Sequence, residues 1–160
     1  MKPNDIEIRV ASAADADSIA AVLHAAFVEY QMLYTAEAFR VTVANATMVR
    51  DRMNDGPVWI ALLDQLIAGT TGAVAHGESL YIRGMAVLPS ARGKGIGENL
   101  LQHIENYARA HDFTRMFLST TPFLDRAIAL YEHFGFRRID AGPSDLFGTP
   151  LFTMEKILKA

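Results

Sequence analysis

The segment that most constrains the fold of this chain is residues 85–97, where an apolar strand leads into a glycine-rich turn and then a helix. Three glycines at alternate positions let the backbone bend and bring its N–H groups close to a ligand that a Cβ would obstruct. The helix adds its free N–H groups and the positive end of its dipole. Arg92 and Lys94 add formal charge on the same turn. The segment therefore predicts a strand-turn-helix unit that binds a phosphorylated cofactor.

The length and composition of the chain indicate that residues 1–160 form one globular domain. The chain has 160 residues, 51% of them hydrophobic, which is enough for one domain with a substantial core. Its net charge of -3 gives no field that favours nucleic acid, and only slightly favours cationic substrates. No cysteine is present, so disulfides and cysteine nucleophiles are excluded. The histidines do not cluster with acidic residues at ligand spacing, so we expect no metal.

We expect no signal peptide and no membrane span in this sequence. Residues 1–5 have neither the basic nor the apolar region of a signal peptide, and no apolar run reaches the length of a membrane span. We therefore expect a cytoplasmic protein that does not associate with membranes.

Strand and helix patterns alternate along the chain without a linker. Apolar alternation and buried runs predict strands at 6–10, 58–63, 66–74, 80–87, 115–120, 136–140 and 151–157. Helical spacing predicts helices from a capping box at Ser12 to about residue 30, after Thr35, at 46–53, from the glycine turn to about residue 111, and at 125–134. This order predicts a mixed α/β sheet, without the strict alternation of a doubly wound fold.

Two familiar phosphate-binding motifs do not fit the glycine turn. A Walker loop requires Ser or Thr after its Lys, whereas Lys94 is followed by Gly95. A Rossmann fingerprint requires the spacing G-x-G-x-x-G and an acidic residue after the next strand. Here the spacing is G-x-G-x-G, and the next strand ends at Leu118-Ser119-Thr120 without a carboxylate.

A third motif does fit, and it resembles a known family. Arg92-Gly93-Lys94-Gly95-Ile96-Gly97 is similar to the acetyl-CoA-binding motif of the GNAT superfamily of N-acetyltransferases, Gln/Arg-x-x-Gly-x-Gly/Ala. Residues 127–136 are similar to the family's second signature, an Ala-x-x-Leu-Tyr helix that ends in Gly-Phe. The resemblance covers the C-terminal half well and implies a single-domain GNAT-like fold, in which helices flank a mostly antiparallel mixed sheet.

The resemblance also implies which residues contact acetyl-CoA. The loop backbone would hold the diphosphate, and the strand before it would splay from its neighbour at 115–120 to pair with pantetheine. Tyr131 matches the position that donates a proton to the departing thiolate. The residues implied in cofactor binding are Met85, Ala86, Val87, Arg92, Gly93, Lys94, Gly95, Ile96, Gly97, Ala127 and Tyr131.

Two positions depart from the family pattern. Leu124 stands seven residues before Tyr131, where the family often has an Asn that contacts the cofactor. The strand before the loop lacks the Glu that often serves as the base. The candidates for a base, acting directly or through water, are Glu78, which we take as catalytic, and then His76, Glu29 and Tyr81.

Together these features predict an enzyme that moves the acetyl group of acetyl-CoA to a primary amine, by direct attack in a ternary complex. A non-catalytic acyl-CoA sensor and a nucleotide-binding regulatory domain are the alternatives. The acceptor is a small molecule or a peptide, and its identity is open. In an aromatic and Met-rich stretch over residues 27–39, we expect Phe27 and Phe39 to pack in the core. Of the remaining residues, Tyr30, Met32 and Tyr34 would line the acceptor pocket or, alternatively, form the interface of a homodimer.

Overall fold

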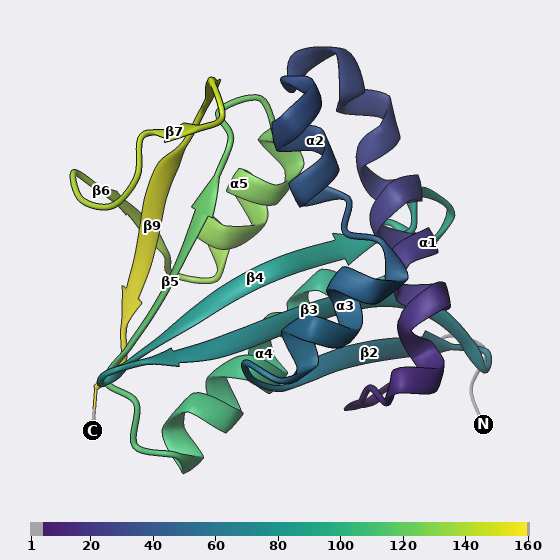
Figure 1. The fold of residues 1–160 in the computed structure, drawn as a ribbon. Helices are drawn as coiled ribbons and strands as arrows, with labels where there is room; N and C mark the ends of the chain where they lie inside the picture. The colour runs from purple at the N-terminus through teal and green to yellow at the C-terminus, as the bar shows by residue number, and fades with distance from the viewer. Residues whose placement is uncertain (1–4, 160) are drawn as a thin grey trace.

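A seven-stranded sheet forms the centre of the protein (Figure 1). The computed structural model describes residues 5–159, so residues 1–4, on which part of the signal-peptide argument rests, lie outside it. The strands are β1 (Ile6–Val10), β2 (Val58–Leu63), β3 (Leu66–His76), β4 (Ser79–Val87), β5 (Arg115–Thr120), β6 (Arg137–Ile139) and β9 (Phe152–Ile157), and β7 (Asp145–Leu146) and β8 (Thr149–Pro150) form a separate hairpin.

The sheet has the order β1-β2-β3-β4-β5-β9-β6. Its central pair, β4 and β5, is parallel, whereas the other neighbouring pairs are antiparallel. This confirms the predicted α/β fold with a mixed, mostly antiparallel sheet. The β7–β8 hairpin is an element that the sequence patterns did not predict.

The helix that begins at residue 36 follows the predicted capping residue Thr35, and the helix that begins at residue 46 follows Asn45, a cap that the sequence patterns did not identify. The capping box at Ser12 precedes a 3-10 segment instead of the first α-helix. Thr35 and Asn45 each accept a hydrogen bond from the backbone N–H three residues later, at 3.2 and 2.9 Å. The first helix, α1 (Ala16–Phe27), is shorter than predicted, because the chain continues as a 3-10 helix after Phe27. The helices are α1 (Ala16–Phe27), α2 (Ala36–Thr42), α3 (Ala46–Met53), α4 (Ile96–Ala110) and α5 (Asp125–His133), with the 3-10 segments η1 (Ala13–Asp15), η2 (Val28–Leu33) and η3 (Pro89–Ala91).

Helices cover both faces of the sheet. Helices α1 and α3 pack on one face and α4 on the other, as Figure 1 shows. Successive residues of β2 supply the two cores, because side chains alternate along a strand. Trp59 packs in the cluster that contains Leu101 of α4, and Ile60 packs in the cluster that contains Ile19 of α1.

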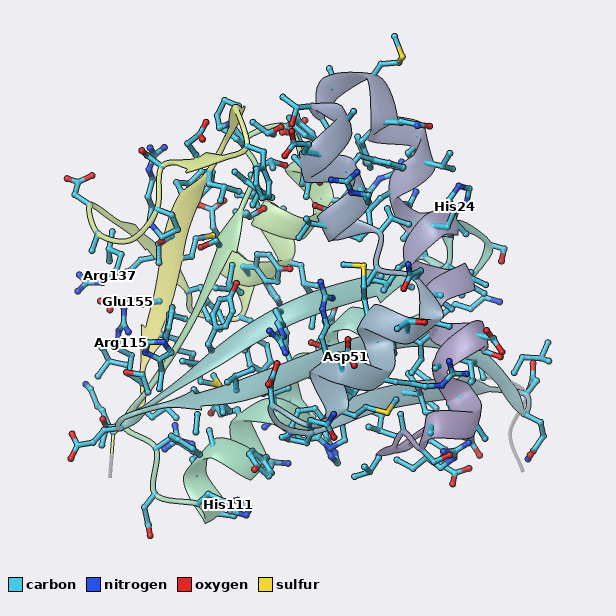
Figure 2. All side chains as sticks on the ribbon, in the orientation of Figure 1. His24, Asp51, His111, Arg115, Arg137 and Glu155 are labelled. Carbon is cyan, nitrogen blue, oxygen red and sulfur yellow. The ribbon has the colours of Figure 1, made fainter. Side chains whose placement is uncertain are left out.

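A charged cluster joins three strands at the opposite edge of the sheet from β1. Glu155 of β9 accepts hydrogen bonds from Arg115 of β5 at 2.6 Å and from Arg137 of β6 at 3.4 Å. Figure 2 shows these three labelled side chains grouped along β9. The Glu155 side chain is only 12% exposed. The hydrogen bond from Arg115 lowers the pKa of Glu155 and outweighs burial, which acts in the opposite direction.

We expect Glu155→Gln to lower the free energy of unfolding by about 1–2 kcal/mol at pH 7, because it removes charge-assisted hydrogen bonds. Urea denaturation measures this. Since the folded pKa lies below the unfolded value of about 4.3, the contribution is complete above that pH and is lost on further acidification. The difference between the wild type and the variant should therefore shrink as the pH falls below about 4. Arg137→Gln is the control, because this side chain is 76% exposed and should contribute little.

Candidate active site

The two central strands separate after three paired residues. Residues 79–81 of β4 pair with residues 115–117 of β5. Beyond this point β4 continues along β3 and β5 continues along β9 (Figure 1). The backbone N–H and C=O groups on the β5 side of residues 83–87 therefore have no strand partner and are available to a ligand. This is the splay that the family resemblance implies.

A β-bulge lies in β4 where the strands separate. Arg83 is opposite Gly72 and Ala86 is opposite Thr70, so β4 has one residue more than β3 between these pairs. Gly84 has a φ of +66°, a conformation that favours glycine. The extra residue reverses the side-chain alternation. Leu80 and Ile82 pack in the core beside α4, whereas Ala86 packs in the core beside α1.

Two cavities flank the separated strands. The first has a volume of about 340 Å³ and is lined by the glycine turn, by the end of β4 and by α5. The second has a volume of about 360 Å³ and is lined by the middle of β4, the end of β5 and the β7–β8 hairpin. Four side chains line both cavities: Phe27, Met85, Leu124 and Tyr131. The arrangement can hold two ligands that meet at these residues.

The glycine turn has the geometry of an anion cradle. Gly93 and Gly95 have φ values of +81° and +82°, in the left-handed region. The first N–H groups of α4, which follow directly, have no acceptor within the helix. The guanidinium of Arg92 donates to Glu29 of η2 at 2.6 Å, so this ion pair ties the turn to the segment after α1.

The structure brings almost all of the predicted cofactor-binding residues together. Every one of them except Lys94 lines the first cavity. Arg126, in the first turn of α5, also lines it and supplies a cation that the sequence motifs did not indicate. The sequence feature that could have indicated this cation is the position of Arg126, one residue before the Ala-x-x-Leu-Tyr signature.

Tyr131 lies at the junction of the two cavities and is only 7% exposed. Burial, and then the nearby Tyr34, raise the pKa of its hydroxyl well above the ordinary value. The hydroxyl thus remains protonated at neutral pH. Such a group can donate a proton to a leaving group that forms beside it.

The predicted bases are scattered. Glu78 is exposed in the turn between β3 and β4 and lines neither cavity, while its backbone carbonyl accepts the Thr114 N–H at 2.9 Å. His76 packs its ring against Phe117, and Glu29 is paired with Arg92. Of the four candidates, Tyr81 lines the second cavity. Glu78 therefore stays a sequence prediction that its position does not favour.

Leu124, which departs from the family pattern, lies at the junction of the two cavities. It precedes α5 and lines both cavities. An apolar side chain occupies the position where the family often has an amide, so this part of the junction is apolar.

Comparison with known proteins identifies the family. The model of the acetyltransferase (GNAT) family matches residues 19–136. The chain belongs to this family. An uncharacterized N-acetyltransferase of Escherichia coli, YjgM, is 43% identical over 74 residues, which are 46% of this chain and 43% of that protein. Human N-acetylaspartate synthetase is 35% identical over 98 residues, which are 60% of this chain and 32% of that protein.

The chain thus spans less than half the length of these curated relatives. Solved structures of the family match it over nearly its whole length. The PaiA N-acetyltransferase of Thermoplasma acidophilum, solved with coenzyme A, has a TM-score of 0.82 at 20% identity and covers 96% of this chain and 99% of its own. This likeness confirms the GNAT fold.

Across residues 5–159, no helix has the length and apolar character needed to cross a membrane. In the same part of the chain, no three or more His, Cys, Asp or Glu side chains are placed to hold a metal ion.

The glycine turn leads to a test with a matched control. Gly95→Ala forces a side chain into the left-handed region, at a cost of about 1–2 kcal/mol. We expect the loop to change conformation and the affinity for acetyl-CoA to fall at least about tenfold, measured by calorimetry. Gly77→Ala carries the same strain, since Gly77 has a φ of +63° and lies in the β3–β4 turn, and should leave the affinity unchanged.

Equal affinities of the two variants would contradict the assignment of the turn. If the protein were instead a nucleotide-binding regulatory domain, ATP or NAD would raise the melting temperature of the wild type more than acetyl-CoA does.

Proposed function

We propose that this protein transfers the acetyl group of acetyl-CoA to a primary amine by direct attack in a ternary complex. The observation that carries the proposal is the meeting of two cavities at Tyr131, where β4 and β5 separate. Membership in an acetyltransferase family supports the reaction. The names of the relatives, N-acetyltransferases, support nitrogen as the atom that is acetylated.

The first cavity fits the donor. Its glycine turn and the start of α4 would hold the diphosphate through backbone N–H groups, with Arg126 adding positive charge. The unpaired edge of β4 would bond to the amides of the pantetheine arm. Acetyl-CoA supplies an acetyl group on a thioester, whose carbonyl carbon is the site of attack.

The chain's own residues then align the two substrates and move protons. The shared wall of Phe27, Met85 and Leu124 is apolar, so it offers water few hydrogen-bonding partners at the junction. As the C–N bond forms and the C–S bond breaks, the Tyr131 hydroxyl gives its proton to the sulfur. The neutral amine that attacks loses one further proton as the amide forms, and this proton goes to the enzyme or to solvent. Because the amine itself attacks the thioester, no protein nucleophile is required.

Tyr131→Phe tests the role of the hydroxyl. We expect kcat to fall roughly 100-fold, the size of a general-acid contribution, while the Kd for acetyl-CoA changes by less than about twofold. Rates are measured as CoA thiol released with a panel of amines. Tyr107→Phe is the control, because Tyr107 stacks on His111 at 4.1 Å and lines neither cavity.

A wild-type rate in Tyr131→Phe with every amine would exclude the proton-donor role. Binding of acetyl-CoA by the wild-type protein without acetylation of any amine would instead favour the non-catalytic sensor.

The amine must lose a proton before it attacks, and Asp145 is placed to assist. Among the Asp and Glu residues that the structure describes, it is the one that lines the second cavity. It is exposed on β7, where its Oδ2 accepts the Gly148 N–H at 3.0 Å. We propose that this carboxylate attracts the ammonium form and accepts its proton directly or through water.

Asp145→Asn should lower kcat/KM about tenfold at pH 7, and the deficit should narrow as the pH approaches the pKa of the amine, where the neutral form needs no base. The pH profile of kcat/KM measures this. Glu78→Gln is the matched control, and we expect it to have wild-type activity. Loss of activity in Glu78→Gln alone would reverse this assignment and support the sequence prediction.

The homodimer and the cytoplasmic location stay predictions. The best candidate surface for a dimer lies on η2, where Met32 and Leu33 are 94% and 56% exposed.

A further inference from the structure

The second cavity contains two arginines that the proposed reaction does not use. Arg52 comes from α3 and Arg83 comes from β4, beside the bulge. The pKa of Arg52 is lowered by burial and then by the charge of Arg83, so the two guanidinium groups influence each other. An acceptor in this cavity lies beside a pair of like charges.

Arg52 lacks a counter-ion. Its Nη2 donates to the backbone carbonyl of Val41 at 3.0 Å, and within the described residues it forms no ion pair. Its Nη1 lies so close to the bulge that a Cβ on Gly84 would be 3.2 Å away. A partly buried cation with one neutral acceptor is poorly compensated. An anion in the cavity would compensate it.

Arg83 is only partly neutralised. Its Nη2 donates to Asp55 at 2.9 Å, but the Asp55 side chain is 55% exposed and does not line the cavity. Asp145 is the other charged residue of the lining and comes from the separate β7–β8 hairpin. The wall formed by α3 and β4 is therefore positive.

We propose that the acceptor is a small amine that also carries an anionic oxygen group, a carboxylate or a phosphate, and that Arg52 and Arg83 bind this group. The planar fork of arginine donates two parallel hydrogen bonds to either anion. The amine then lies at the end of the cavity that Met85 and Tyr131 share with the donor side. This assignment of the acceptor rests on the proposed acetyl transfer. It differs from the cationic substrates that the net charge of the chain slightly favours.

The first experiment compares acceptors that have an anionic group with partners that lack it. β-Alanine is paired with β-alaninamide, and 2-aminoethyl phosphate with ethanolamine, and 1,3-diaminopropane is the cationic member. We expect the anionic member of at least one pair to have a KM about 10- to 100-fold lower than its neutral partner. The pair with the larger ratio identifies the anion. A preference for neutral or cationic amines would overturn the inference.

The second experiment tests whether Arg52 is responsible for the preference for anionic amines. Arg52→Gln should raise the KM for the preferred anionic amine about 10- to 100-fold, with a smaller change in kcat and no change in the Kd for acetyl-CoA. Arg52→Lys keeps the charge but loses the fork, so its KM should be intermediate. Arg50→Gln is the control, because Arg50 lies on the same helix, pairs with Asp17 at 3.9 Å and does not line the cavity.

An equal rise in KM for the anionic amine and its neutral partner in Arg52→Gln would overturn the inference, since it would indicate altered packing. Melting temperatures of the variants identify any that fail to fold, and Arg83→Gln then provides a second test of the same wall.

A binding measurement separates this inference from the proposed function. If neutral amines alone are acetylated, the inference fails and the transferase stands. If the anionic amine raises the melting temperature of the wild type but not of Arg52→Gln, and no amine is acetylated, the anion site stands and the transferase fails.

Discussion

The separation of β4 and β5 is the constraint on which the rest of the site depends. Each strand is held by a ladder on its other side, β4 by β3 and β5 by β9, so the two halves of the sheet stay ordered where they do not touch. Backbone groups left open inside a protein must find other partners. The bulge at Gly84, the apolar wall and the two cavities are all arranged around this opening.

The three glycines of the turn are required for two different reasons, backbone conformation and helix packing. Gly93 and Gly95 adopt the left-handed conformation, and a Cβ at either would meet no backbone atom nearby. Gly97 is within α4, where an added Cβ would lie 2.7 Å from Leu130 of α5. It therefore allows α4 and α5 to approach closely beside the first cavity, which both residues line. One motif thus combines backbone conformation with helix packing.

Much of the fold and of the donor side could be predicted from the sequence, because local patterns determine them. The alternation of apolar residues predicted the strands, and a capping residue such as Thr35 predicted where a helix begins. The glycine turn predicted an anion-binding site. The second cavity, which we propose as the acceptor site, could not be predicted in this way. Arg52 and Asp145 are far apart in the chain and carry no local pattern, and they face one cavity only because the fold places α3 and β7 around it. Glu78 lies close in sequence to β4 residues of the cavity, but at the end where the strands are still paired.

The position of the last hairpin has an evolutionary consequence. The family match ends at residue 136, whereas Pro143, Asp145, Leu146 and Leu151 form part of the second cavity and contribute nothing to the first. Changes in this segment can alter the proposed acceptor site without touching the residues proposed to bind the donor. The four shared side chains do not have this freedom, because a change there alters both cavities at once. Diversification of such a chain is therefore expected to begin in the hairpin and in α3, while the junction stays fixed.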